Sequence, residues 1–172
     1  MTGYLRPFGN VTKVLCRPTI LYLEPMGDSK KQRWENRRQV AALPLSHDDA
    51  GQVQVLLVTS RDTGRWVLPK GWPMKGKKPH RAAEQEAYEE AGLIGRVRKV
   101  PVGSYSYEKR LATGSTVPCE VTVFPLEVEQ HRRRWPEMRE RQRRWFSPDE
   151  AAGVVAEEGL RHILRNVAQH AQ

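Results

Sequence analysis

Apolar stretches along the chain, several of them alternating with polar residues, predict a β-sheet accompanied by helices. Continuous β-branched and apolar runs predict buried strands at residues 39–45 and 53–59, followed by a short strand at 65–68. Alternation predicts further strands at residues 97–107 and 117–128, a basic hairpin loop at 108–114 between them, and a last strand at 143–146. His47, Asp48 and Asp49 precede a glycine, and we interpret them as a solvated turn and not as a metal site.

Helix signals occur at two places. Residues 81–91 are rich in Ala and Glu, with Pro79 suited to the helix entry and Gly92 to its C-terminal cap. Near the C-terminus, Ser147 begins a capping box, and we expect two short helices at residues 148–156 and 160–170. The second of these carries an apolar stripe at helical spacing, which we assign to the core: Leu160, Ile163, Leu164 and Val167.

Length and charge narrow the class of protein. A chain of 172 residues is long enough for one domain with its own core, and we expect residues 37–172 to form it, with residues 1–36 as an N-terminal extension. The net charge of +9 indicates polyanionic partners such as polyphosphates or nucleic acid. Two cysteines in no metal-binding pattern indicate free buried thiols. No apolar run is long enough for a membrane span or a signal peptide, so we expect a cytoplasmic protein without membrane partners.

Three carboxylates crowd one face of the helix at residues 81–91. Glu86 lies three residues before Glu89 and four before Glu90, which brings all three side chains to the same side. Clustered carboxylate oxygens suit Mg²⁺, which shares its coordination shell with substrate phosphates. An exposed acidic face would cost only about 0.2–0.5 kcal/mol per like-charged pair, so the spacing alone leaves both interpretations open.

The stretch from Gly71 to Leu93 resembles the Nudix box. Its pattern is matched without a gap at Gly71, Glu86, Ala87, Glu89, Glu90, Gly92 and Leu93. Lys77 and Gln85 stand where the pattern has Glu and Arg, which implies a changed set of supporting side chains around the site. The resemblance implies a Nudix fold of the α/β (α+β) class: an α/β/α sandwich with a mixed central sheet flanked by helices.

Stretches outside the box are similar to the diphosphoinositol polyphosphate phosphohydrolase branch of the Nudix enzymes. They are VLLVTSRDTGRWVLPKG, EEAGLIG and RRWFSPDEAAGVV, spread over residues 37–155. The resemblance implies that Glu89 is the catalytic base and that Glu86, Glu90 and the backbone carbonyl of Lys70 bind Mg²⁺ or Mn²⁺, with Glu89 as a further metal ligand. The substrate-binding positions that it implies are Arg37, Arg38, Thr59, Ser60, Arg61, Lys70, Gly71, Trp72, Arg110, Arg141 and Arg143.

We therefore expect a metal-dependent pyrophosphohydrolase that cleaves phosphoanhydride bonds in dinucleoside polyphosphates or diphosphoinositol polyphosphates. Lys75, Lys77 and Lys78 would add positive charge to the box loop, unless they simply remain solvated. One alternative is a catalytically weak module that binds nucleic acid or nucleotides through the arginine-rich run at 131–144. Another is an RNA 5′-end pyrophosphohydrolase, which shares the same box; RNA is the less favoured partner. The oligomeric state stays open.

Overall fold

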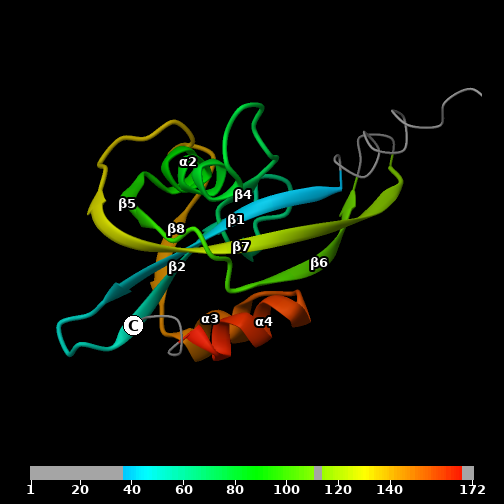
Figure 1. The fold of residues 1–172 in the computed structure, drawn as a ribbon. Helices are drawn as coiled ribbons and strands as arrows, with labels where there is room; N and C mark the ends of the chain where they lie inside the picture. Colours follow the sequence, from blue (N-terminus) through cyan, green and yellow to red (C-terminus); the bar gives the residue numbers. More distant parts are fainter. Residues whose placement is uncertain (1–36, 111–113, 168–172) are drawn as a thin grey trace, which may run out of the picture.

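A computed structural model describes residues 37–110 and 114–167 of the chain (Figure 1). Its strands are β1 (Arg38–His47), β2 (Val53–Thr59), β3 (Trp66–Val67), β4 (Lys70–Gly71), β5 (Leu93–Val97), β6 (Gly103–Arg110), β7 (Thr116–His131) and β8 (Arg143–Phe146). Its helices are α2 (Pro79–Ala91), α3 (Pro148–Val154) and α4 (Glu158–Arg165). None of these helices combines the length and the apolar character needed to cross a membrane.

All eight strands of the described residues join one mixed sheet. Its main path runs β3-β2-β1-β7-β5, with β4 beside β1, β6 beside β7 and β8 beside β2. The central pair, β1 and β7, is parallel, and the other pairs are antiparallel. Because β4 pairs with β1 through Val40 and Gly71, the start of the box loop is held against the middle of the sheet.

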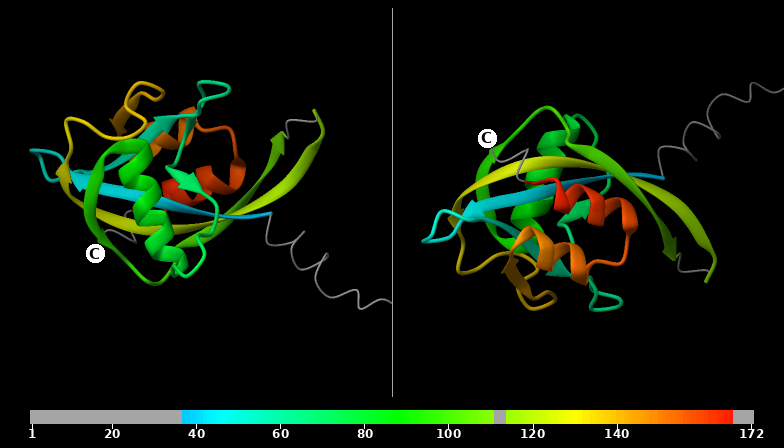
Figure 2. Two further views of the ribbon diagram at one scale, coloured as in Figure 1. Left: turned by 90° about the horizontal axis from the view of Figure 1, so that it is seen from above. Right: turned by 90° about the horizontal axis from the view of Figure 1, so that it is seen from below.

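Helices cover both faces of this sheet, as Figure 2 shows from above and below. Alternate residues of β1 enter different cores: Val40 and Ala42 pack with α2, whereas Ala41 and Leu43 pack with α3 and α4. This arrangement confirms the predicted α/β/α sandwich with a mixed sheet. The predicted stripe on the last helix is confirmed as core, because Leu160, Ile163, Leu164 and Val167 are all buried.

Helix α2 begins and ends where the sequence predicts. Pro79 occupies its first turn, and Gly92 caps its C-terminus in the left-handed conformation, with φ of 66°. A side chain larger than hydrogen at Gly92 would also press on the Trp135 ring. Fully buried alanines on one side of the helix allow close packing on the sheet: Ala82, Ala83, Ala87 and Ala91.

The prediction of one strand at residues 97–107 is wrong. In the structure β5 ends at Val97, where this range begins, and β6 starts only at Gly103, because the two strands pair with different halves of the 16-residue β7. The predicted hairpin loop is also placed too early, since β6 continues through Glu108 to Arg110. The N-terminal extension expected at residues 1–36 lies outside the described residues.

The last two helices are close to their predicted ranges. Ser147 caps α3 through a complete capping box with Glu150, as expected. Helix α4 begins at Glu158, slightly before the predicted start, and ends at Arg165. Cys119 is buried and free, in agreement with the expectation for the thiols, whereas Cys16 lies outside the described residues.

Candidate active site

Gly71 meets Glu86 where the box loop leaves the sheet. The Glu86 carboxylate lies so close to the Gly71 Cα that a methyl group at residue 71 would overlap it. A glycine therefore allows the loop and the carboxylate to occupy adjacent space. Lys70, the preceding residue, sends its side chain to the opposite side of the sheet, where its Nζ lies 5.5 Å from the centroid of the Tyr107 ring.

The box carboxylates differ in burial and in electrostatics. Glu90 is only 5% exposed, whereas Glu86 and Glu89 are partly exposed. Burial raises the pKa of Glu86 to about 7, and the negative charges of Glu90 and Glu89 add to the rise. Burial also raises the pKa of Glu90, although Arg141 and Lys70 oppose this effect. The helix thus concentrates acidic groups where a nearby cation would stabilise their charged forms.

Arg141 supplies the positive charge beside Glu90. One of its terminal nitrogens, Nη2, donates to Glu90 Oε1, while the Lys70 backbone N–H donates to the other oxygen, Oε2, over 3.1 Å. The same guanidinium donates to Glu137 Oε2 at 2.6 Å and to the Thr59 carbonyl at 2.9 Å. Its contacts with Glu90, Glu137 and Thr59 occupy the Arg141 side chain, which is only 7% exposed. In this arrangement Arg141 supports the site from within, and its predicted contact with substrate stays a prediction.

Gln85 contacts the predicted catalytic base. Its amide Nε2 donates to Glu89 Oε1 over 2.6 Å. Gln85, which replaces the arginine of the box pattern, therefore still provides a hydrogen bond to the Glu89 carboxylate. The other departure, Lys77, lies exposed in the loop with Lys75 and Lys78. The two replacements therefore have different consequences: Gln85 orients a site carboxylate, and Lys77 adds charge at the surface.

The box carboxylates fit a divalent cation in their chemistry. Within residues 37–110 and 114–167, no group of three or more His, Cys, Asp or Glu side chains already surrounds a shared metal position. Arg141 explains part of this absence, because its guanidinium forms a hydrogen bond with one of the two carboxylate oxygens of Glu90. Glu86 carries no hydrogen bond or ion pair to another described residue, and its pKa of about 7 reflects its burial first and then the negative charges of Glu90 and Glu89. Glu86, Glu89 and Glu90 are thus oxygen donors of the kind that Mg²⁺ or Mn²⁺ prefers.

The turn after β2 is fastened to the segment that precedes β8. The Thr59 hydroxyl accepts from the backbone N–H of Gln142 at 2.9 Å. Arg61 lies 3.6 Å from Glu137 Oε1 and 3.4 Å from Glu140 Oε2, and these carboxylates raise its pKa. Ser60, between them, pairs with the Thr63 hydroxyl at 2.6 Å. The structure therefore brings Thr59, Arg61 and Arg141 together, and their assignment to substrate binding stays a prediction.

Glu137 is a site residue that the sequence interpretation missed. It contacts Arg61 and Arg141, and its backbone N–H donates to the Glu89 carbonyl at 3.1 Å. One signal was present, because an acidic residue stands four positions before Arg141 within an arginine-rich run. Trp135 was missed as well: its Nε1 donates to the Glu90 carbonyl at 3.2 Å, and its ring packs against Gly92.

Arg143 holds the C-terminal end of α2. Its guanidinium donates to the carbonyls of Ala91 and Arg132 and stacks over the Trp135 ring, 4.0 Å from the ring centroid. A cation at this end of a helix is favourable because the last carbonyls are negative. Its predicted contact with substrate stays a prediction.

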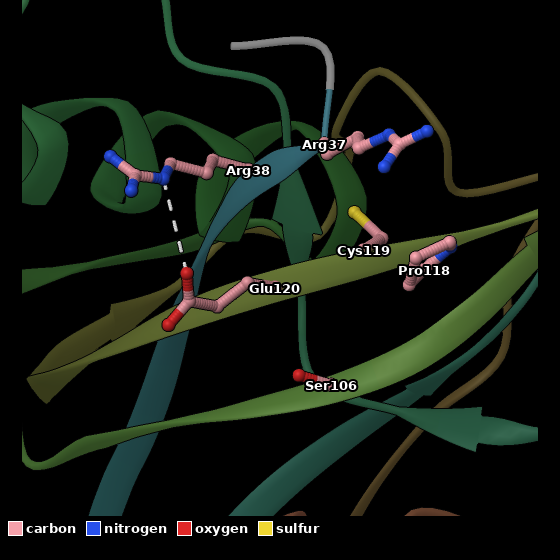
Figure 3. Close-up of a pocket in the computed structure, with 6 residues that line it drawn as sticks. All are labelled: Arg37, Arg38, Ser106, Pro118, Cys119 and Glu120. Carbon is pink, nitrogen blue, oxygen red and sulfur yellow. Dashed lines mark ion pairs between the residues drawn. The ribbon is translucent and has the colours of Figure 1, made fainter. Parts of the chain in front are cut away.

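A cavity of about 190 Å³ opens where β1 begins (Figure 3). It is lined by Arg37, Arg38, Ser106, Pro118, Cys119 and Glu120. Figure 3 shows Arg38 directed toward Glu120, with 3.9 Å between Arg38 Nε and Glu120 Oε2. Arg37 and Arg38 thus lie two or three residues before Val40, the partner of Gly71 in the sheet. Arg110 ends β6, and its side chain lies outside the described residues.

Comparison with known proteins identifies the family. The NUDIX domain model matches residues 35–169. The chain is 31% identical over 120 residues to "Nudix hydrolase 12, mitochondrial" of Arabidopsis thaliana, which covers 68% of this chain and 59% of that protein. It is 32% identical over 106 residues to "Diphosphoinositol polyphosphate phosphohydrolase 3-alpha" of Mus musculus, which covers 59% of this chain and 60% of that protein. The chain therefore spans about three fifths of the length of these curated relatives.

A solved structure supports the fold. The E. coli dihydroneopterin triphosphate pyrophosphohydrolase superposes with a TM-score of 0.60 and 18% identity, over 78% of this chain and 97% of that one. This similarity concerns the fold, and the match of the NUDIX domain model to residues 35–169 shows that the chain belongs to the Nudix family.

Proposed function

We propose that the protein is a metal-dependent hydrolase of phosphoanhydride bonds, acting on dinucleoside polyphosphates or diphosphoinositol polyphosphates. The observation that carries the proposal is the gathering of Glu86, Glu89 and Glu90 beside the Gly71 loop, with a hydrogen-bond donor fixed on Glu89. The similarity to a diphosphoinositol polyphosphate phosphohydrolase supports the inositol branch of this substrate class. The net charge of +9 suits either polyanion.

In this mechanism Glu86, Glu90 and the Lys70 carbonyl would hold Mg²⁺ or Mn²⁺. When bound, the cation would neutralise phosphoryl oxygens and help orient water. Glu89 accepts the proton of the attacking water, and Gln85 holds the Glu89 carboxylate in one orientation. Arg141 opposes the rise in the pKa of Glu90 that burial causes. Arg61, exposed beside this network, would supply a guanidinium for phosphate oxygens.

Replacement of Glu89 by Gln tests the assignment of the base. We expect kcat to fall by about 10²- to 10⁴-fold, because a general base contributes on this order. The assay measures phosphate released from both substrate classes with Mg²⁺, with Mn²⁺ and with a chelator, which should abolish turnover. Glu84→Gln is the matched control, since Glu84 lies on the same helix and pairs with Arg81 over 2.7 Å. Equal turnover in Glu89→Gln and Glu84→Gln would refute the role of Glu89.

The alternative of a catalytically weak binding module has less support. A module that only binds polyanions would gain from losing its acidic residues, yet the three box glutamates remain and one has a dedicated amide donor. An RNA 5′ end presents the same phosphoanhydride bond, and the substrate screen should include triphosphorylated RNA. Cytoplasmic localisation stays a prediction, because the curated relatives include a protein named as mitochondrial.

A further inference from the structure

Lys70 forms contacts on both faces of the sheet where the box loop begins. Its backbone N–H donates to Glu90 Oε2 over 3.1 Å, on the face that α2 covers. Its side chain passes to the other face, where Lys70 Nζ lies 5.5 Å from the centroid of the Tyr107 ring, within the range of a cation–π contact. One residue therefore connects a carboxylate of the candidate active site to the side of the sheet covered by α3 and α4.

The ring that receives this ammonium is itself held in place. The Tyr107 hydroxyl donates to Gln39 Oε1 over 2.7 Å, and Gln39, on β1, is only 4% exposed. A second contact joins β6 to the box loop, since Lys109 Nζ lies 4.2 Å from the centroid of the Trp72 ring. The side chain of Lys70 therefore ends against a surface that β1 and β6 fix.

A buried carboxylate lies on the same face. Glu157, which precedes α4, has one oxygen, Oε1, 3.6 Å from Arg65 Nη1, and its side chain is only 9% exposed. Among the residues that the structure describes, its other oxygen, Oε2, is the one buried side-chain N or O atom without a hydrogen-bond partner. The start of α4 is packed tightly on β6, because a methyl group at Gly159 would lie 2.9 Å from Tyr105 Cβ.

The unpaired oxygen and the ammonium have complementary needs. A buried carboxylate oxygen is costly unless a donor or a positive charge compensates it. Burial lowers the pKa of Lys70, and the negative charges of Glu90 and Glu157 oppose this shift. Because Arg65 approaches Oε1, the oxygen Oε2 is the part of the Glu157 carboxylate that is left for Lys70.

We propose that Lys70 is a positioning residue: attraction between its ammonium and Glu157 Oε2, direct or through one bound water, fixes the orientation of its own backbone groups. The backbone N–H holds Glu90, and the carbonyl is the group proposed above as a ligand of the cation. A side-chain anchor matters here because β4 consists of only two residues. The inference rests on the proposed function, since the carbonyl that Lys70 positions belongs to the proposed metal site.

Amide hydrogen exchange in the metal-free protein tests the anchor without turnover. Lys70→Met keeps an unbranched side chain without the charge, and it should speed exchange of the residue-70 amide by about 10- to 100-fold, the range that one charged interaction supplies. Glu157→Gln should have a similar effect. In the double variant the rate should be no higher than in the faster single variant, because the two side chains act as one pair. The Val102 amide, which donates to the Val123 carbonyl at 2.9 Å, is the internal reference.

Calorimetry of Mg²⁺ binding at pH 8, above the pKa of about 7 of Glu86, separates positioning from charge. If Lys70 acted only through its charge, it would repel a nearby cation, and Lys70→Met would bind Mg²⁺ more tightly. Positioning predicts the opposite, a loss of about 10- to 100-fold, because a displaced supporting group weakens a metal site. Lys70→Arg keeps the positive charge and should retain most of the affinity.

Two control variants match these changes. Lys99→Met removes an exposed ammonium between β5 and β6, and it should alter neither the exchange of the residue-70 amide nor Mg²⁺ binding. Arg65→Met removes the exposed partner of Glu157 Oε1 and should leave the exchange rate at residue 70 nearly unchanged, because Oε2 is the oxygen assigned to Lys70.

Two results would overturn the inference while leaving the proposed function intact. One is unchanged or tighter Mg²⁺ binding by a folded Lys70→Met protein, and this variant decides alone if Glu157→Gln does not fold. The other is additive effects of the two substitutions on exchange, which would show that Lys70 and Glu157 act separately. Failure of the proposed function has a different signature: the wild type would neither bind Mg²⁺ nor release phosphate, and the exchange rates would still decide whether the two side chains act as a pair.

Discussion

Arg141 donates to the Glu90 carboxylate from a position 51 residues further along the chain. The pair connects the box helix to the segment before β8, and it is almost fully buried, with 7% of each side chain exposed. Because Lys70 and Glu137 join the same network, the charge of Glu90 depends on three separate parts of the fold. A buried carboxylate that loses such a partner is left with an uncompensated charge.

Replacement of Arg141 by Gln should destabilise the metal-free protein strongly. Loss of one partner of a buried pair costs about 3–5 kcal/mol, so we expect a clear drop in the denaturant midpoint in the presence of a chelator. Saturating Mg²⁺ should recover part of the loss, because the cation would supply positive charge beside Glu90. Arg139→Gln, an exposed position in the same segment, is the control. A loss of the same size with and without Mg²⁺ would contradict this account.

Replacement of Gly71 by Ala should separate folding from function. The methyl group would overlap the end of a flexible side chain, the Glu86 carboxylate, so the backbone can stay in place while the carboxylate moves away. We expect the melting temperature to change little and the Mg²⁺ affinity measured by calorimetry to fall at least about tenfold, since a misplaced ligand weakens a site. Gly153→Ala in α3, where a methyl group meets no atom within 4 Å, provides the comparison. Unchanged Mg²⁺ affinity would show that Glu86 is not a ligand.

The pKa of Glu86 predicts how stability depends on pH without metal. In the folded protein this pKa is raised from 4.5 to about 7, so between these values the folded state binds more protons than the unfolded state. The free energy of unfolding should therefore fall as pH rises through this window and remain lower above it. Denaturant midpoints at pH 5, 6, 7 and 8 with a chelator measure the slope. Glu86→Gln should flatten it, and an identical slope in that variant would assign the effect to other groups.

The exposed lysines of the box loop give a prediction about ionic strength. Lys75, Lys77 and Lys78 are all exposed, so their attraction for a polyanion would be screened by salt. If they attract substrate, changing all three to Ala should raise KM at low salt and leave kcat nearly unchanged, and the difference should shrink at about 0.5 M salt. Steady-state kinetics with a dinucleoside polyphosphate would decide. If the wild type and the triple variant had the same KM at low salt, these three lysines would have no role in attracting substrate.

Local sequence patterns predicted the helix that carries the carboxylates, but they could not predict which distant segments pair with one another. Pro79 and Gly92 determine the ends of α2 through backbone geometry alone, so the sequence is sufficient there. Glu137 and Trp135 reach the site only because β8 pairs with β2, and no local pattern encodes that pairing. Arg141 was noticed in the sequence, but its contacts with Glu90 and Thr59 required the fold.

The strand error at residues 97–107 has a similar origin. β7 is long enough to pair with two strands on the same edge. The chain therefore leaves β7 after β5 and returns to the other half of β7 as β6. Gly95 allows the close approach of β5, because a methyl group there would overlap the Glu127 carbonyl. A pattern of alternating residues reports which faces are apolar, but it does not report which neighbouring strand each part will join.

Lys70 and Gly71 are neighbours in sequence, yet they belong to opposite sides of the sheet. This offers protein engineers a practical separation. Substitutions at residue 70 would therefore act directly on the side of the sheet covered by α3 and α4, whereas substitutions at residue 71 would act on the side that faces Glu86.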